Sequence, residues 1–265
     1  MPRIVSQKDF SKHRKLTFCY LCGKPLDGTS PTNDDHCPPK SVFNAIDRSN
    51  YPIILKVHKK CNHSWHLSDD MLSRFFDPLS NQGKVNKSKH QKQMEKRKVG
   101  IVFQGFEVYG YKDVPLRPFG KRLIQCMHAL LYKEWLPTGT ICDIMFPFAQ
   151  ANQKGQSVSD EIRDVSLAMS KRIVSSVKAE SYDFVTAYKN KFKYVCCWST
   201  FDSGNPICLF AFDIMHMSKM AIPLCVLPKA AIGYYALKPP QAEHSKATKL
   251  QLPLTEEDIL YPLPF

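Results

Sequence analysis

The sequence predicts an α+β protein in which an early stretch rich in metal-ligating residues precedes a longer region of helices and strands. Hydrophobic residues make up 43% of the 265 residues and charged residues 23%, values typical of a globular chain with a hydrophobic core. Residues 101–111 alternate in a β-rich pattern, which indicates a strand or hairpin. Residues 116–137 place apolar side chains at helical spacing, which indicates an amphipathic helix closed by Pro137.

The composition changes twice along the chain, which predicts three regions: residues 1–82, 83–99 and 100–265. The first begins with a short helix or basic arm over residues 1–15 and holds the ligand-rich segment. The second is a basic linker or helix, since residues 84–98 contain seven Lys or Arg against one Glu. The third is expected to be an α+β accessory domain with helices and an antiparallel hairpin.

Further elements are expected within residues 100–265. Residues 159–177 predict a second helix, with Ser157 or Ser159 as its N-cap. Residues 192–199 and 207–215 predict a strand pair around a loop, and residues 220–228 a further short strand. The Pro- and Lys-rich tail after Ala236 is expected to be extended.

The charge of the chain favours an acidic partner. The net charge is +13 and the isoelectric point about 9.2, which attracts phosphate backbones, although such charge also serves solubility or another acidic partner. The first residues lack the apolar segment of a signal peptide, and no apolar run is long enough to span a bilayer. We therefore expect a cytoplasmic protein without a membrane partner.

The cysteine pattern favours metal binding over disulfides. In a reducing cytoplasm, closely paired cysteines are typical metal ligands. The remaining cysteines lie scattered in apolar stretches, where we expect small buried hydrophobic side chains. These are Cys126, Cys142, Cys196, Cys197, Cys208 and Cys225.

Two spaced pairs predict a structural zinc site. Cys19 and Cys22 form a CxxC knuckle followed by Gly23, and His58 and Cys61 form a second pair with the same gap. Three thiolates and one imidazole suit tetrahedral zinc. Cys37 is the alternative fourth ligand, but His58 is favoured because its spacing makes a second knuckle.

A second set of residues predicts a catalytic metal beside the zinc. Asp35 offers a hard oxygen ligand for Mg²⁺ or Mn²⁺, and the adjacent His36 offers an imidazole that can deprotonate water near neutral pH. Neighbouring residues of a strand point to opposite faces. We therefore expect the strand to end near Pro38, so that both side chains reach one phosphate.

The opposite wall is expected to come from one helix face. Asn62 and His66 are four residues apart, and Asp70 follows four further on as an alternative ligand or supporting partner. His63 is a weaker candidate because it points away from Asn62. A helix N-cap is the alternative role for Asn62, and packing near Trp65 is the alternative for His66.

These motifs resemble the HNH (ββα-metal) endonucleases, in the bacterial branch with a CxxC knuckle, a DHxxPKS segment and an (H/C)xxCN segment. The resemblance covers roughly residues 16–76. It implies two antiparallel strands, a loop and a helix that hold one divalent metal and hydrolyse a phosphodiester bond. By this resemblance His36 is the general base, Asp35 and Asn62 are metal ligands, and His66 matches the last histidine of the pattern. Asn44, or else Asn50, matches the asparagine that braces the loop.

The expected function is therefore metal-dependent cleavage of double-stranded DNA, in a role such as restriction or phage defence. A single site would cut both strands as a homodimer or by sequential nicks. There are two alternatives: a non-catalytic zinc-stapled nucleic-acid-binding module and a protein-interaction domain. Neither alternative needs the adjacent Asp35 and His36 together with Asn62. The expected DNA contacts are Lys40, Arg74, Lys92, Lys96 and Arg97.

Overall fold

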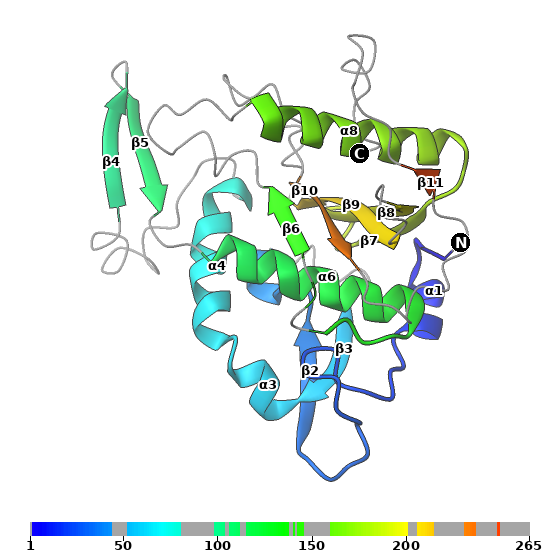
Figure 1. Cartoon of the computed structure of the whole chain (residues 1–265). Coiled ribbons are helices and arrows are strands. Elements are labelled where there is room, and N and C mark those ends of the chain that lie inside the picture. The colour runs from blue at the N-terminus through cyan, green and yellow to red at the C-terminus, as the bar shows by residue number, and fades with distance from the viewer. Residues whose placement is uncertain are drawn as a thin grey trace.

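The structure is a computed structural model with a mixed sheet, two long helices and a smaller ββα unit (Figure 1). It describes residues 2–43, 52–80, 98–103, 106–111, 115–137, 140, 142–145, 160–200, 206–214, 231–236 and 248–249. The α+β class expected from the sequence is confirmed. Within these ranges, no helix has both the length and the apolar character needed to cross a bilayer.

The main sheet is built largely from the C-terminal half of the chain. Its central strands, β7 (Asp183–Ala187), β8 (Phe192–Thr200), β9 (Pro206–Ile214) and β10 (Ala231–Ala236), pair antiparallel in that order. β6 (Cys142–Met145) extends the sheet beyond β10. At the other edge β1 (Arg3–Ile4) pairs parallel with β7, and β11 (Thr248–Lys249) pairs parallel with the end of β8. The predicted strand pair β8–β9 is confirmed.

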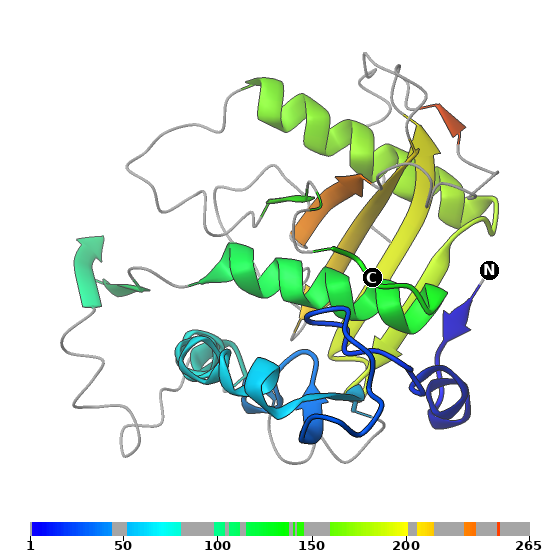
Figure 2. The ribbon, with the colours of Figure 1, turned by 60° about the horizontal axis from the view of Figure 1, so that its bottom comes forward.

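Each face of the sheet is covered by one long helix, as Figure 2 shows. In β9, Ile207, Leu209 and Ala211 share a core cluster with Ile173 of α8 (Asp160–Lys178). The alternate side chains of the same strand, including Phe210, belong to the core cluster of α6 (Leu116–Tyr132). The period-two alternation of β9 therefore separates the two faces of a fully buried strand.

Helix α6 is buried on nearly all sides because the sheet lies on one side of it and the ββα unit on the other (Figures 1 and 2). The amphipathic helix that the sequence predicted is present, but its exposed face is narrow: Arg117 and Pro118 are exposed near its start, and the residues from Arg122 to Leu131 are buried. Its buried polar residues Gln125 and His128 find partners: Gln125 Nε2 donates to the Leu136 carbonyl at 3.1 Å, and His128 Nδ1 lies 2.9 Å from the Tyr235 hydroxyl. The helix ends before Pro137, at Lys133 in a left-handed conformation with φ 59°.

The ββα unit consists of β2 (Thr32–His36), β3 (Ile54–His58), α3 (Lys59–His63) and α4 (His66–Ser80). The strands are antiparallel, with Asp35 opposite Leu55. A short 3₁₀ turn at Lys40–Val42 follows β2. Helix α1 (Gln7–His13) precedes the unit, and Ser6 is its N-cap. Of the two alternatives expected for residues 1–15, a short helix or a basic arm, the helix is present.

One hydrophobic cluster includes residues of both the ββα unit and the C-terminal half, among them Leu55, Phe76 and Leu123. Tyr188 illustrates the join, because its ring stacks on Phe43 with centroids 4.0 Å apart and its hydroxyl donates to the Pro38 carbonyl at 3.1 Å. The two parts of the chain thus share a core. The division into separate domains stays a prediction.

Other expectations have mixed outcomes. The hairpin predicted at residues 101–111 is present as β4 (Lys98–Phe103) and β5 (Phe106–Tyr111), and the second helix is α8. The strands β1, β6, β7, β10 and β11 were not predicted, because they are short or lie in segments without a clear alternation. The expectations for residues 84–97, Ser157, Ser159, residues 220–228 and most of the tail lie outside the described residues.

Candidate metal centre and adjoining acidic cavity

The first knuckle is a tight turn held by backbone hydrogen bonds. Cys19 N–H donates to the Lys24 carbonyl at 2.9 Å, and Gly23 N–H donates back to the Cys19 carbonyl at 2.8 Å. Gly23 has φ +76°, a left-handed conformation that glycine adopts without steric cost. A Cβ at this position would lie only 2.4 Å from Cδ2 of Trp135, so the turn also needs glycine for space.

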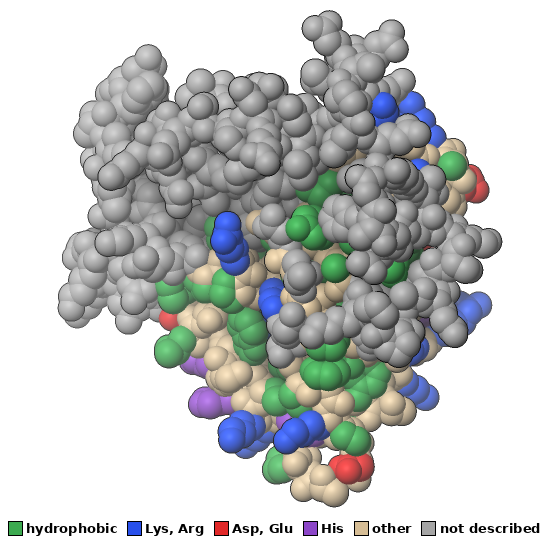
Figure 3. Space-filling model, viewed as in Figure 1, with side chains coloured by type: hydrophobic (Ala, Val, Ile, Leu, Met, Phe, Trp, Pro, Cys, Tyr) green, Lys and Arg blue, Asp and Glu red, His purple; other side chains and the backbone are tan. Residues whose placement is uncertain are grey.

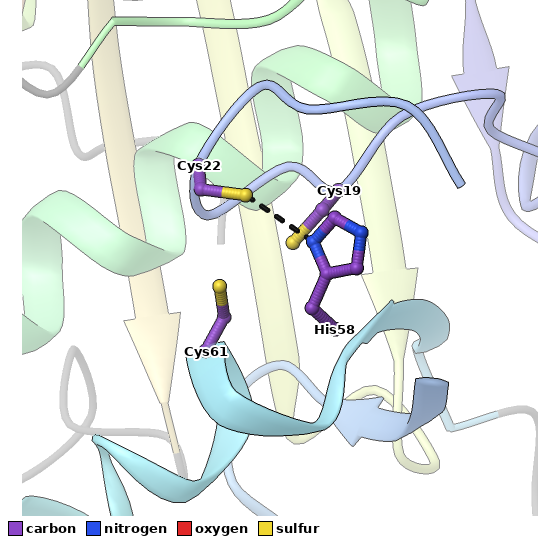
Figure 4. Close-up of side chains that lie close together, drawn as sticks. All are labelled: Cys19, Cys22, His58 and Cys61. Atoms are coloured by element: carbon purple, nitrogen blue, oxygen red, sulfur yellow. Dashed lines mark hydrogen bonds between the residues drawn. The ribbon is translucent and has the colours of Figure 1, made fainter. Parts of the chain in front are cut away.

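The two predicted pairs come together in space. The ligand atoms of Cys19, Cys22, His58 and Cys61 all lie within 4.8 Å of one another (Figure 4). His58 Nδ1 is 3.3 Å from Cys22 Sγ, and Nε2 is 3.1 Å from the Pro25 carbonyl. Nε2–H bonded to a carbonyl leaves Nδ1 as the lone-pair nitrogen that faces the sulfurs, which is the usual arrangement of a metal-binding histidine.

Without a cation, two of the three clustered thiols resist ionisation. Burial, together with neighbouring sulfurs, raises the pKa of Cys61 to about 12, and burial also raises the pKa of Cys19. Burial opposes ionisation of Cys22 as well, but hydrogen bonds from Lys24 N–H and His58 lower its pKa overall. A divalent cation would stabilise all three thiolates, so the cluster can hold a structural metal such as zinc.

The alternative fourth ligand, Cys37, lies elsewhere. It is buried and hydrogen-bonded to Cys126 of α6, and it is not a member of the four-residue cluster. His58 is therefore the residue that completes the set. Of the scattered cysteines, Cys126, Cys196, Cys197 and Cys208 are buried as expected, Cys142 is half-buried and Cys225 lies outside the described residues.

Beside this cluster is an open cavity of about 610 Å³ between β2, α3 and α4. Histidine and basic side chains are visible over α3 and the start of α4 in Figure 3. The residues that the sequence singled out as a second site line this one cavity. They are Asp35, His36, Lys40, Asn62, His63, His66 and Asp70, together with the unpredicted Asp34 and Asp69.

The strand ends where the sequence predicted it would. β2 stops at His36, directly before Cys37 and the two prolines. Asp35 is buried at 2% exposure, and His36 is half-buried; both line the cavity.

The prediction that Asn62 and His66 lie on one helix face is wrong. Helix α3 ends at His63, a turn follows at Ser64 and Trp65, and α4 begins at His66. Asn62 is within α3 and does not cap it, because the N-cap is His58. Asn62 and His66 still line the same cavity.

Asn62 is oriented by β2. Its Nδ2 donates to Asn33 Oδ1 and to the Asp34 carbonyl, each at 3.2 Å. These bonds occupy the amide nitrogen. The amide oxygen Oδ1 accepts no hydrogen bond from the described residues and can therefore bind a ligand.

Asp35 is held by two residues that the sequence reasoning missed. Its Oδ2 accepts the hydroxyl hydrogen of Tyr20, and its Oδ1 pairs with Arg122 of α6, N to O 2.5 Å. Burial, and then the nearby Asp35 charge, raise the pKa of Tyr20 well above its usual range, so the phenol remains a donor. An ionised carboxylate has about four acceptor positions, so these two bonds leave Asp35 with acceptor capacity toward the cavity.

Arg122 joins two carboxylates. Its second nitrogen bonds Asp69 Oδ1 at 2.6 Å, and its guanidinium lies over the Trp65 ring, 5.0 Å from the centroid. Burial raises the pKa of Asp69 to about 6, although Arg122 favours the ionised form. One buried cation thus supports two acidic groups at the cavity wall.

Spacing gave no sign of Tyr20, Asp69 or Arg122, because Arg122 is 87 residues from Asp35 and 53 from Asp69. Two weaker signals existed. Tyr20 stands between two predicted metal ligands, and Arg122 directly precedes the apolar pair Leu123 and Ile124 of the helical pattern.

The described residues form no preassembled cage for the predicted catalytic metal. Among the described residues, the zinc-type cluster is the one group of three or more His, Cys, Asp and Glu with converging ligand atoms. Mg²⁺ usually binds through one or two carboxylates and several waters, and the oxygen donors of the cavity fit that chemistry. The catalytic metal and its ligands Asp35, Asn62 and His66 therefore stay predictions.

Some predicted site residues cannot be placed. Asn44, Asn50, Lys92, Lys96 and Arg97 lie outside the described residues, as does the side chain of Arg74. Comparison of the chain with protein-family models, with curated proteins and with solved structures gives no match. The resemblance to HNH endonucleases thus stands on the motif residues themselves.

Proposed function

We propose that this protein is a metal-dependent endonuclease that hydrolyses phosphodiester bonds of DNA at the acidic cavity. One observation carries the proposal: His36, Asp35 and Asn62, from β2 and α3, line the same open cavity directly beside a Cys₃His cluster. A structural zinc site needs only its four ligands. The Asp-His step and the oriented asparagine have no role in holding that metal.

The cavity residues have separate tasks in this proposal. His36 removes a proton from the attacking water as the water oxygen bonds to phosphorus and the bond to the leaving 3′ oxygen breaks. Asn62 and Asp35 offer oxygen ligands, and Lys40 and Lys59, which also line the cavity, neutralise the bound phosphate. A bound Mg²⁺ or Mn²⁺ supplies Lewis-acid stabilisation of the developing negative charge.

A second candidate is a nucleic-acid-binding module without catalysis. The observation that favours it is the engagement of both Asp35 oxygens by Tyr20 and Arg122, which would suit a purely structural carboxylate. The net charge of +13 is compatible with either function.

Plasmid nicking separates the two candidates. We expect the purified protein to relax supercoiled plasmid with Mg²⁺ or Mn²⁺, and His36→Ala to lower the rate at least about 100-fold, as for loss of a general base. His13→Ala is the matched control, because His13 is half-buried and bonds the Leu130 carbonyl far from the cavity. Nicking by His36→Ala at the wild-type rate would rule out the proposed mechanism.

The structural zinc is tested by metal content. Cys22→Ser is expected to lose bound zinc and to unfold at a lower temperature, because the ligand set becomes incomplete. Cys142→Ser is the control, since Cys142 is also half-buried but stands outside the cluster, and it should keep the metal. A Cys22→Ser protein with wild-type thermal stability and no zinc would contradict the assignment.

A further inference from the structure

A second cavity, of about 380 Å³, lies beside the acidic one. Its walls come from the turn before α4, from the first turns of α6 and from β6; they include Trp65, Arg117, Lys121, Arg122 and Ile144. This volume falls within the range of about 300–1,000 Å³ common for ligand pockets.

The Trp65–Arg122 pair forms the partition between the two cavities. Both residues line the second cavity, while Arg122 bonds Asp35 and Asp69, which line the first. The two cavities are therefore neighbours that share Arg122 as a structural link.

The two cavities differ in their balance of charged side chains. The lining of the first includes four aspartates, Asp34, Asp35, Asp69 and Asp70, and two lysines, Lys40 and Lys59. Among the described residues, the lining of the second includes Arg117, Lys121 and Arg122 and no Asp or Glu. Arg122 is paired with two carboxylates, and Arg117 and Lys121 are the other two cations of this lining.

The position of these two cations suits a phosphate group. Arg117 and Lys121 are four residues apart, so they lie one turn apart on the same face of α6. Both are near the N-terminal end of this helix, whose first turn contains no acidic residue. The helix dipole adds to their attraction for an anion.

The rest of the cavity suits the non-ionic part of a nucleotide. Trp65, Pro118 and Ile144 add aromatic and aliphatic surface to the lining. Aromatic and apolar surfaces of this kind contact sugars and bases without sequence preference.

We propose that the second cavity binds a nucleotide of the same DNA strand that enters the acidic cavity, with Arg117 and Lys121 on the phosphate flanking the cleaved one. This subsite rests on the proposed nuclease function. In this proposal the aspartates of the first cavity face a metal ion, and the cations of the second cavity bind the phosphate backbone of the strand.

The test is DNA binding by Arg117→Gln/Lys121→Gln, in a His36→Ala background so that the DNA stays intact. Anisotropy of a labelled duplex is measured over a series of salt concentrations without added divalent metal. We expect affinity to fall about tenfold and the slope of log K against log salt to fall by about 2, as for two lost phosphate contacts.

The matched control is Lys8→Gln/Lys12→Gln. These lysines are exposed, four residues apart on α1, and near the opposite end of α6, where His13 bonds the Leu130 carbonyl. We expect less than about a twofold loss of affinity in this control. Equal losses in the two double variants would show a general charge effect and overturn the subsite; so would unchanged binding by Arg117→Gln/Lys121→Gln.

Kinetics of the otherwise wild-type protein locate the effect. Arg117→Gln/Lys121→Gln should raise KM for plasmid nicking about tenfold and leave kcat within about twofold, because the lost contacts bind substrate and transition state alike. An active wild type with an unaffected double variant overturns the subsite and keeps the nuclease. A wild type that never nicks, but binds DNA through these two residues, overturns the nuclease and keeps the subsite.

Discussion

At the scale of single residues, Gly23 connects the metal cluster to the C-terminal half of the chain. Its left-handed backbone completes the CxxC turn, and the Trp135 ring packs where a side chain would be. In the sequence, this glycine directly follows the CxxC knuckle. The packing partner is 112 positions away and had no sequence signal.

Gly23→Ala should therefore cost more stability than Gly28→Ala. Gly28 is also left-handed, at φ +85°, but a Cβ there meets nothing within 4 Å. We expect a loss of about 1–2 kcal/mol for Gly28→Ala from the backbone alone, and a further 1–3 kcal/mol or so for Gly23→Ala from overpacking. Urea unfolding of the zinc-loaded protein measures both, and equal losses would contradict the packing role of Trp135.

Asp35 shows how neighbouring residues with similar sequence signals can differ in environment. Asp34 is exposed and pairs with Lys56 at 3.0 Å, whereas Asp35 is buried and pairs with Arg122. The alternation of β2 explains this difference, because adjacent strand residues point to opposite faces.

At the scale of elements, α6 is the helix on which both halves of the molecule depend. Its apolar side chains belong to the core shared with the sheet, and its Arg122 enters the ββα unit. Residues of this helix line the basic cavity, and Arg122 braces the acidic one. The periodicity of residues 116–137 predicted the helix, but not that it would be enclosed on both sides.

Arg122→Met should destabilise the protein by about 3–5 kcal/mol, because Asp35 and Asp69 would lose a buried counter-charge. Arg117→Met, on the exposed side of the same helix, should cost less than about 1 kcal/mol. Denaturant unfolding of both variants gives the comparison.

A double-mutant cycle with Asp35→Asn isolates the ion pair. We expect the free-energy loss of the double variant Arg122→Met/Asp35→Asn to be smaller than the sum of the losses of the two single variants. Each single variant leaves one buried charge without its partner, whereas the double variant removes both charges of the pair. Additive losses would show that the Arg122–Asp35 pair does not contribute to stability.

At the scale of the whole molecule, residues 1–82 are expected not to reach their native stability alone. Their core cluster includes Leu123 and Tyr188, and β1 pairs with β7. We expect the 1–82 fragment, even with zinc, to show no cooperative thermal transition, because its buried apolar face and Asp35 would be exposed.

Circular dichroism of this fragment against the full chain, each with measured zinc content, checks the expectation. Zinc binding with loss of the cooperative transition is the outcome that fits the shared core. A cooperative transition at the temperature of the full chain would instead support residues 1–82 as an independent domain.

Local patterns were sufficient for the metal cluster and for the main helices and strands. Two pairs of ligand residues with fixed gaps predicted the cluster that includes Cys19 and Cys61. Periodicities of 2 and 3.6 residues predicted the strand pair β8–β9 and helix α6.

Tertiary packing alone decided which distant residues meet. Arg122 became the partner of Asp35, Trp135 closed over Gly23, and Trp65 with Arg122 separated an acidic from a basic cavity. These contacts join residues that are far apart along the chain, and no spacing rule covers them, because the way one buried face packs on another depends on every other contact in the shared core.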